Sequence, residues 1–179
     1  EFLTNVTHFI DRSIDSLHNY SYSVRAMMGD RSGQASESSS IQPVVELMDD
    51  RDPRVQYGPA FHNWEDADLF AGTEKYADLT VDSYSDNDAT ARITFNGRGI
   101  EIYGLKSSEL GLAEVQIDGK KVGDLDFHTS GETEKSALIG RFTGLPDREH
   151  LLTLTVKKEH LNRGNERSKI SIDYFKIYP

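Results

Sequence analysis

The sequence predicts an all-β protein built mainly as an antiparallel β-sandwich of the jelly-roll type. First, short segments in which apolar and polar residues alternate recur along the chain. Second, turn signals separate these segments at intervals of roughly 8–12 residues, as in sandwiches. Third, helix signals are scarce, because the longest candidate helix, 65–76, is broken at Ala71-Gly72-Thr73 and lacks a sustained helical period. Without crossover helices a parallel α/β fold is disfavoured.

The predicted strands are, in order, 89–95, 100–103, 113–118, 122–127, 137–142, 151–156 and 170–177. Three turns separate them. Asn96-Gly97-Arg98-Gly99 predicts the first, Asp118-Gly119 predicts a tight hairpin, and Gly144-Leu145-Pro146-Asp147 predicts the third.

Composition excludes several classes of function. The 179 residues hold 20 Lys+Arg against 30 Asp+Glu, a net charge of -10. An acidic surface repels phosphate, so we expect no nucleic-acid partner. The mean hydropathy is -0.58, and no apolar run is long enough for membrane insertion. No secretory or targeting segment is visible in the sequence. The absence of cysteine excludes disulfides, a thiol nucleophile and cysteine-ligated metal.

The composition changes near residue 45. Residues 1–45 contain no lysine, and the small polar stretch 31–40 reads as a loop or an exposed edge strand. The charged connector Asp49-Asp50-Arg51-Asp52-Pro53 follows. We therefore predict two domains, residues 1–45 and residues 46–179.

Residues 7–42 resemble the last three strands of a fibronectin type III domain. The resemblance rests on Leu17-His18-Asn19-Tyr20-Ser21-Tyr22-Ser23-Val24-Arg25-Ala26, followed by Gly29-Asp30-Arg31-Ser32. The first four strands of such a domain are absent from the sequence. The resemblance thus implies a partial domain whose open face is covered by something else, for example by strands of another chain.

Residues 47–179 carry a second pattern, made of the segments 49–58, 89–100, 111–119, 142–145, 150–152 and 172–175, with Trp64 between the first two. It is similar to the carbohydrate-binding-type, galactose-binding-like β-sandwich modules of secreted bacterial glycoside hydrolases. This resemblance implies a non-catalytic module in a secreted or cell-surface enzyme with other modules, where it binds glycan. Relatives often carry Asn-Arg-Gly where this sequence has Glu109-Leu110-Gly111.

The candidate carbohydrate-binding residues lie in the stretch 57–66. Aromatic faces pack on the apolar C–H patches of sugars, and planar polar groups bind hydroxyls. Tyr57, His62, Asn63 and Trp64 supply both kinds of group, and Gly58-Pro59 predicts a loop or a strand end there. The alternative for Trp64 is a buried core anchor.

The stretch 82–88 is the candidate metal site. Asp82, Asp86 and Asp88 offer oxygen ligands suited to a structural calcium ion. The stretch lacks the central glycine and the distal glutamate of an EF-hand loop, so a solvated acidic turn is the alternative.

No motif for catalysis is present. The sequence has no Gly-x-Ser-x-Gly, no His-x-x-x-His and no Gly-x-x-x-x-Gly-Lys, and no carboxylate pair sits in a recognisable catalytic context. We therefore predict a non-catalytic module that binds glycan and directs its parent glycoside hydrolase to carbohydrate. The alternative is a structural spacer or protein-interaction module that docks on the catalytic domain or on another chain. Full burial of Trp64, Tyr57 and Phe61 would favour that alternative.

Overall fold

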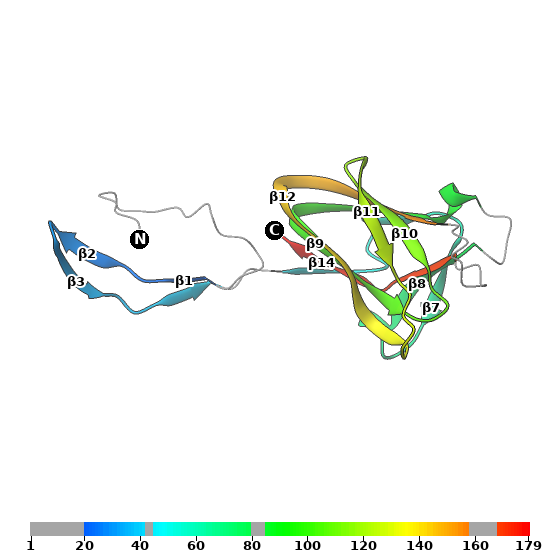
Figure 1. Cartoon of the computed structure of the whole chain (residues 1–179), viewed down its shortest axis with the longest axis horizontal. Helices are drawn as coiled ribbons and strands as arrows, with labels where there is room; N and C mark the ends of the chain where they lie inside the picture. Colours follow the sequence, from blue (N-terminus) through cyan, green and yellow to red (C-terminus); the bar gives the residue numbers. More distant parts are fainter. Residues whose placement is uncertain (1–19, 42–44, 80–84, 158–167) are drawn as a thin grey trace. The chain divides into compact units, whose positions relative to one another are not determined.

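The computed structural model describes residues 20–41, 45–79, 85–157 and 168–179, and the chain divides into two compact units, residues 1–44 and 45–179 (Figure 1). The part of the fibronectin-like pattern before Tyr20 lies outside the described residues. Nowhere in the described ranges does a helix have the length and apolar character needed to cross a bilayer.

The described part of the first unit is one antiparallel ribbon. Its strands are Tyr20–Tyr22 (β1), Arg25–Met28 (β2), Arg31–Ala35 (β3) and Ser39–Ile41 (β4). β1 pairs with β4 and β2 pairs with β3, around a turn in which Gly29 has a φ of 58°. A ribbon of two strands buries little surface by itself. The interpretation of this unit as part of a fibronectin-like domain stays a prediction.

The second unit consists of two antiparallel sheets. The larger sheet contains Glu46–Asp49 (β5), Val55–Tyr57 (β6), Thr90–Lys106 (β9), Leu112–Ile117 (β10), Lys120–Asp126 (β11), Glu134–Val156 (β12) and Tyr174–Tyr178 (β14). Its strand order is β11-β10-β12-β9-β14-β5, and β6 also pairs with β9. The smaller sheet contains Phe61–Glu65 (β7), Thr73–Asp78 (β8) and Lys169–Ile172 (β13), in the order β13-β8-β7.

The only helical elements among the described residues are two 3-10 turns, Phe70–Gly72 (η1) and Asp86–Ala89 (η2). The candidate helix 65–76 is therefore not a helix. Its residues form the end of β7, the turn η1 and most of β8. The all-β, antiparallel sandwich predicted from the sequence is confirmed.

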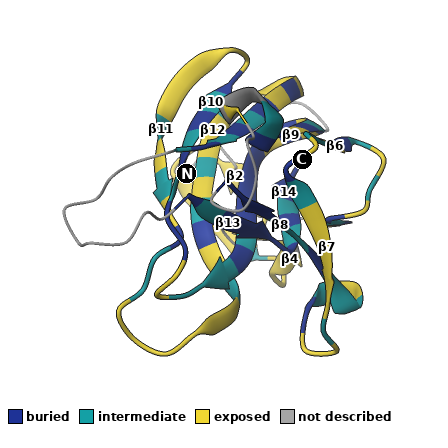
Figure 2. Cartoon of the chain, turned by 90° about the vertical axis from the view of Figure 1, so that its right-hand side faces the viewer, coloured by how far each residue is buried: buried dark blue, intermediate teal, exposed yellow. Residues whose placement is uncertain are grey.

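The core lies where the alternating pattern placed it (Figure 2). Ala91, Ile93 and Phe95 of β9 are fully buried, while Arg92 between them is exposed. Each large buried side chain of this kind contributes about 2 kcal/mol relative to an exposed one. Burial of one face of each strand therefore sets the register of the larger sheet.

The predicted turn at 96–99 is wrong, because β9 continues through it as one strand. Gly97 has a φ of 144°, and a Cβ atom there would collide with the backbone oxygen of Tyr178. Opposite it, residues 144–147 of β12 have no partner between Thr143 and Arg148. The glycines thus permit a bulge and a close backbone approach rather than a chain reversal.

The Asp118-Gly119 hairpin is confirmed. It joins β10 to β11, and both residues have positive φ values, 53° and 76°. The Asp118 carboxylate accepts a hydrogen bond from the backbone N–H of Leu151 at 3.0 Å. It also lies 2.9 Å from Nδ1 of the buried His150 and 2.6 Å from Arg148. The Leu151 N–H is the largest cause of a pKa of Asp118 below its ordinary value, followed by His150.

We expect Gly104→Ala to destabilise the protein by about 2 kcal/mol or more, because the added Cβ would overlap the backbone oxygen of Ser171. Gly131→Ala is the matched control, since its Cβ would meet only Oγ1 of Thr129 at 3.5 Å. Urea denaturation of both variants checks this. Equal stability of the two would contradict the close packing of β9 on β13.

Asp118→Asn should lower the free energy of unfolding by about 2 kcal/mol at pH 7. Asparagine tolerates the positive φ, so the loss comes from the charge. A carboxyl whose pKa is lowered by folding stabilises the fold above its unfolded pKa, and this stabilisation disappears as the pH falls through the folded pKa. The difference between wild type and variant should therefore shrink below about pH 4. A pH-independent difference would contradict this assignment.

Candidate functional site

The edge strand β7 carries three of the four sequence-predicted carbohydrate-binding residues. It pairs only with β8 among the described residues, with His62 opposite Tyr76 and Trp64 opposite Glu74. Directly opposed residues in an antiparallel pair point to the same face of the sheet, and successive residues point to opposite faces. The strand therefore separates His62 and Trp64 from Asn63.

His62, Trp64, Glu74 and Tyr76 form what we call the β7 patch. Trp64 has a relative exposure of 55%, which is unusual for a tryptophan, and His62 is exposed too. The ring centroids of His62 and Tyr76 are 5.5 Å apart. Trp64 is not the core anchor considered as its alternative. The patch offers an indole face for apolar C–H groups and an imidazole and a phenol for hydroxyls.

Glu74 stands opposite Trp64 on β8, with its carboxyl group beneath the exposed part of the patch. The residue is buried, and the hydroxyl of Ser171 donates a hydrogen bond to its Oε2. Burial raises the pKa of Glu74, the Ser171 hydrogen bond opposes that rise, and the charges of Asp173 and Asp50 add to it.

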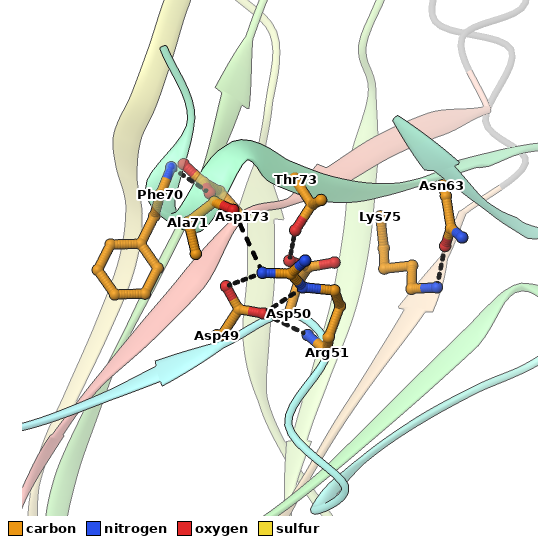
Figure 3. A network of polar contacts seen from close by, with 9 residues as sticks. All are labelled: Asp49, Asp50, Arg51, Asn63, Phe70, Ala71, Thr73, Lys75 and Asp173. Atoms are coloured by element: carbon orange, nitrogen blue, oxygen red, sulfur yellow. Dashed lines mark hydrogen bonds and ion pairs between the residues drawn. The ribbon is translucent and has the colours of Figure 1, made fainter. Parts of the chain in front are cut away.

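On the opposite face of β7, Lys75 contacts both Asn63 and Tyr57. Its ammonium group donates a hydrogen bond to Oδ1 of Asn63 (Figure 3) and lies 5.4 Å from the ring centroid of Tyr57. The Tyr57 ring also packs on Phe61, with centroids 4.9 Å apart. Tyr57 and Asn63 thus lie together, on the face away from His62 and Trp64.

Two buried polar atoms lie close to Lys75. Oδ2 of Asp50 and the hydroxyl of Tyr57 have no hydrogen-bond partner within the described ranges. The other oxygen of Asp50 accepts a hydrogen bond from Oγ1 of Thr73 at 2.7 Å. Burial raises the pKa of Asp50, and Thr73 and Lys75 are among the groups that oppose the rise. Because the Tyr57 hydroxyl is buried, Tyr57 can support a ligand site from behind but cannot touch a ligand with this group.

A second set of contacts fixes the loop between β7 and β8 (Figure 3). The guanidinium of Arg51 donates to Asp49 at 2.7 Å and to the carbonyl of Ala71 at 3.2 Å. The backbone N–H of Phe70 donates to Oδ1 of Asp173 at 3.0 Å. These contacts hold η1 and thereby orient the edge strand that carries Trp64.

The proposed calcium ligands can be followed only in part. Asp82 lies outside the described residues, and the side chain of Asp86 is not described. The carboxylate of Asp88 accepts hydrogen bonds from the backbone N–H and the hydroxyl of Ser85, at 2.8 and 2.7 Å, and so caps η2. Within the described residues, no group of three or more acidic or histidine side chains could hold a metal ion. The calcium site stays a prediction.

Sequence reasoning missed Glu74, Lys75 and Tyr76. All three lie in the segment 65–76, which was the longest candidate helix in the sequence. Residues 74–78 (Glu-Lys-Tyr-Ala-Asp) do not alternate strictly between apolar and polar, so the sequence carries no clear strand signal there.

Comparison with known proteins gives no matching family model. Two curated relatives from Flavonifractor plautii match at low identity. A type blood alpha-D-galactosamine galactosaminidase is 24% identical over 128 residues, and A type blood N-acetyl-alpha-D-galactosamine deacetylase is 26% identical over 112 residues. These matches cover 72% and 63% of this chain, but only 11% and 13% of the relatives' lengths.

Solved structures share the fold. A family 35 carbohydrate-binding module from Clostridium thermocellum superposes with a TM-score of 0.50 at 13% identity, over 75% of this chain and 98% of that one. This is the β-sandwich fold of carbohydrate-binding modules. A Paenibacillus xanthan lyase (TM-score 0.54, 16% identity) and a two-domain esterase active on acetylated mannans (0.53, 15%) also match, over 82% and 75% of this chain. The match spans 14% of the lyase chain and 36% of the esterase chain.

Lys75→Met should destabilise the protein by about 1 kcal/mol at pH 8, because Asn63 loses its donor and Asp50 loses a nearby cation. Folding raises the pKa of Asp50, so its charged form disfavours the fold, and protonation at low pH removes that cost. The effect of the variant should therefore be smaller at pH 4 than at pH 8. Chemical denaturation measures both, with the exposed Lys120→Met as the control. An effect that grows at low pH would contradict this role.

Proposed function

We propose that this chain is a non-catalytic, glycan-binding module and that the β7 patch is its binding site. The observation that carries the proposal is the exposure of Trp64 on an edge strand, with His62 and Tyr76 on the same face. An exposed indole face beside polar rings is the arrangement that a pyranose ring fits, apolar C–H groups on the aromatic face and hydroxyls at its edge. The shared fold supports this reading.

The proposed ligand class is a glycan that carries an amino or acetamido sugar. The two curated relatives are named for acting on galactosamine and N-acetylgalactosamine of the A-type blood group. Both are much longer than this chain, which matches about a tenth of each. Glycans ending in these sugars are therefore the first ligands to test.

We further propose that the module belongs to a secreted glycoside hydrolase and holds it near its substrate. A single patch of this size binds weakly, so targeting depends on several modules or repeated epitopes acting together. The buried carboxyl groups support a non-catalytic role. Glu74 and Asp173 both accept hydrogen bonds from the fold itself, from Ser171 and from Ser136.

Full burial of Trp64, Tyr57 and Phe61, with no concave polar and aromatic surface left, would have favoured the spacer alternative. Trp64 is exposed, and Tyr57 and Phe61 are only partly buried. The condition that favoured a spacer is therefore not met.

A glycan array followed by calorimetry tests the proposal. We expect Trp64→Ala to weaken binding about tenfold or more, because the aromatic contact supplies a large share of a small interface. His62→Ala should weaken it less, and Asn63→Ala least, since Asn63 lies on the opposite face. Circular dichroism must show that each variant is folded.

Val122→Ala is the matched control, since Val122 is an exposed apolar residue on β11. It should bind as the wild type does. Absence of binding to every glycan, or equal affinity of the Trp64 and Val122 variants, would overturn the site.

A further inference from the structure

The solvent-facing side of strands β12, β9 and β14 carries a row of charges that the proposed function does not use. The strand register places Arg141 of β12, Glu101 of β9 and Lys176 of β14 opposite one another. Nε of Arg141 donates to Oε1 of Glu101 at 2.5 Å, and Nζ of Lys176 is 3.9 Å from Oε2. The hydroxyl of Tyr103 donates to the same Oε2 at 2.8 Å.

The carboxylate in this row is buried and the two cations are not. The Glu101 side chain has a relative exposure of 1%, against 51% for Arg141 and 33% for Lys176. Burial alone would raise the pKa of Glu101, but hydrogen bonds from Tyr103, Tyr178 and Arg141 together lower it. Glu101 is thus an ionised group beneath two cations, and the surface of the row is positive on an otherwise acidic chain.

The guanidinium of Arg141 has unused donors. Only its Nε is bound, and its two terminal nitrogens have no partner in the parts of the chain that the structure describes. Since Glu101 accepts from Nε, this contact restrains the guanidinium before any ligand arrives. The pair of terminal N–H groups matches two oxygens of a carboxylate or a sulfate.

Aromatic rings flank the cations. Tyr103 and Tyr174 stack with centroids 4.4 Å apart and planes within 7°, and Phe70 follows at 4.7 Å from Tyr174. Nζ of Lys176 lies 5.7 Å from the centroid of Tyr103. Asp49, which stands opposite Tyr174 on β5, is already paired with Arg51 at 2.7 Å.

We propose that this face, defined by Arg141, Lys176, Tyr103 and Tyr174, is a second glycan-binding surface that takes an anionic sugar group, a carboxylate or a sulfate. The anion lies against the terminal nitrogens of Arg141 and the ammonium of Lys176. The sugar that carries it lies against the edges of the two partly exposed tyrosines, because their stacked faces are covered by each other and by Phe70. This surface belongs to the larger sheet, whereas the β7 patch belongs to the smaller one.

The test is a titration of the isotope-labelled 179-residue chain with three oligosaccharides of equal length: an oligogalacturonate, a sulfated galactan and a neutral galactan. The two anionic ligands should shift the Nε resonance of Arg141 and the amides of β9 and β14, and the neutral one should not. The comparison of the two anionic arms distinguishes carboxylate from sulfate. Binding should weaken as salt rises.

Arg141→Lys keeps the positive charge but removes the paired terminal N–H groups of the guanidinium. Lys176→Gln removes the second cation and leaves the short Arg141–Glu101 contact in place. Each should weaken anionic binding about tenfold. Arg92→Gln, an exposed arginine at the other end of β9, is the matched control and should bind normally. Trp64→Ala should also bind the anionic ligands normally, which separates this surface from the proposed function.

Two results would overturn the proposal. One is the absence of shifts with both anionic ligands up to about 10 mM. The other is an equal loss of affinity in Arg92→Gln and the two variants of this face, because that would indicate attraction to general positive charge.

Discussion

The structure of the second unit depends on Asp173, the residue that connects its two sheets. It stands where the chain leaves the smaller sheet at β13 and enters the larger sheet at β14. Its N–H donates to the carbonyl of Tyr103 at 2.9 Å, and its carbonyl accepts from the N–H of Asp50 at 3.1 Å. Its carboxyl oxygens accept from the Phe70 N–H at 3.0 Å and the Ser136 hydroxyl at 2.5 Å. One fully buried residue thus joins β9, β12, η1 and the residue that directly follows β5.

Both candidate binding surfaces are built from this junction. The Phe70 contact holds η1, which closes the hairpin that presents Trp64. Tyr174 follows Asp173 directly and stacks between Phe70 and Tyr103. Burial raises the pKa of Asp173, and the hydrogen bonds from Ser136 and Phe70 offset part of that rise. The junction therefore satisfies a costly buried group while setting the geometry of two surfaces on different sheets.

The fold could be predicted from the sequence because burial of every second residue of a strand requires apolar and polar residues to alternate along the sequence. The strand around Ile93 and the turn at Asp118-Gly119 follow from period and turn chemistry alone. The bulge at Gly97 could not be predicted, because a glycine serves a turn and a close backbone approach equally well. Only the position of Tyr178, far away in sequence, decides between the two.

The site was predicted less well than the fold. The sequence predicted a loop or a strand end at 57–64 and grouped His62, Asn63 and Trp64 together. In a strand successive side chains alternate between faces, which separates Asn63 from the other two. The alternation also placed Glu101 on the polar side of β9, and the structure buries it there. Its cover comes from Arg141 and Lys176, on strands that are neighbours only in the folded sheet. Such long-range partners have no local signature.

Trp64 is the one tryptophan of the chain, so its fluorescence reports on the β7 patch alone. The most direct measurement is the emission spectrum of the wild-type protein during titration with a glycan ending in galactosamine or N-acetylgalactosamine. We predict a saturable change in emission, since a sugar that covers the exposed indole removes water from it. Binding detected by calorimetry with an unchanged emission spectrum would contradict the account, because the ligand would then sit elsewhere.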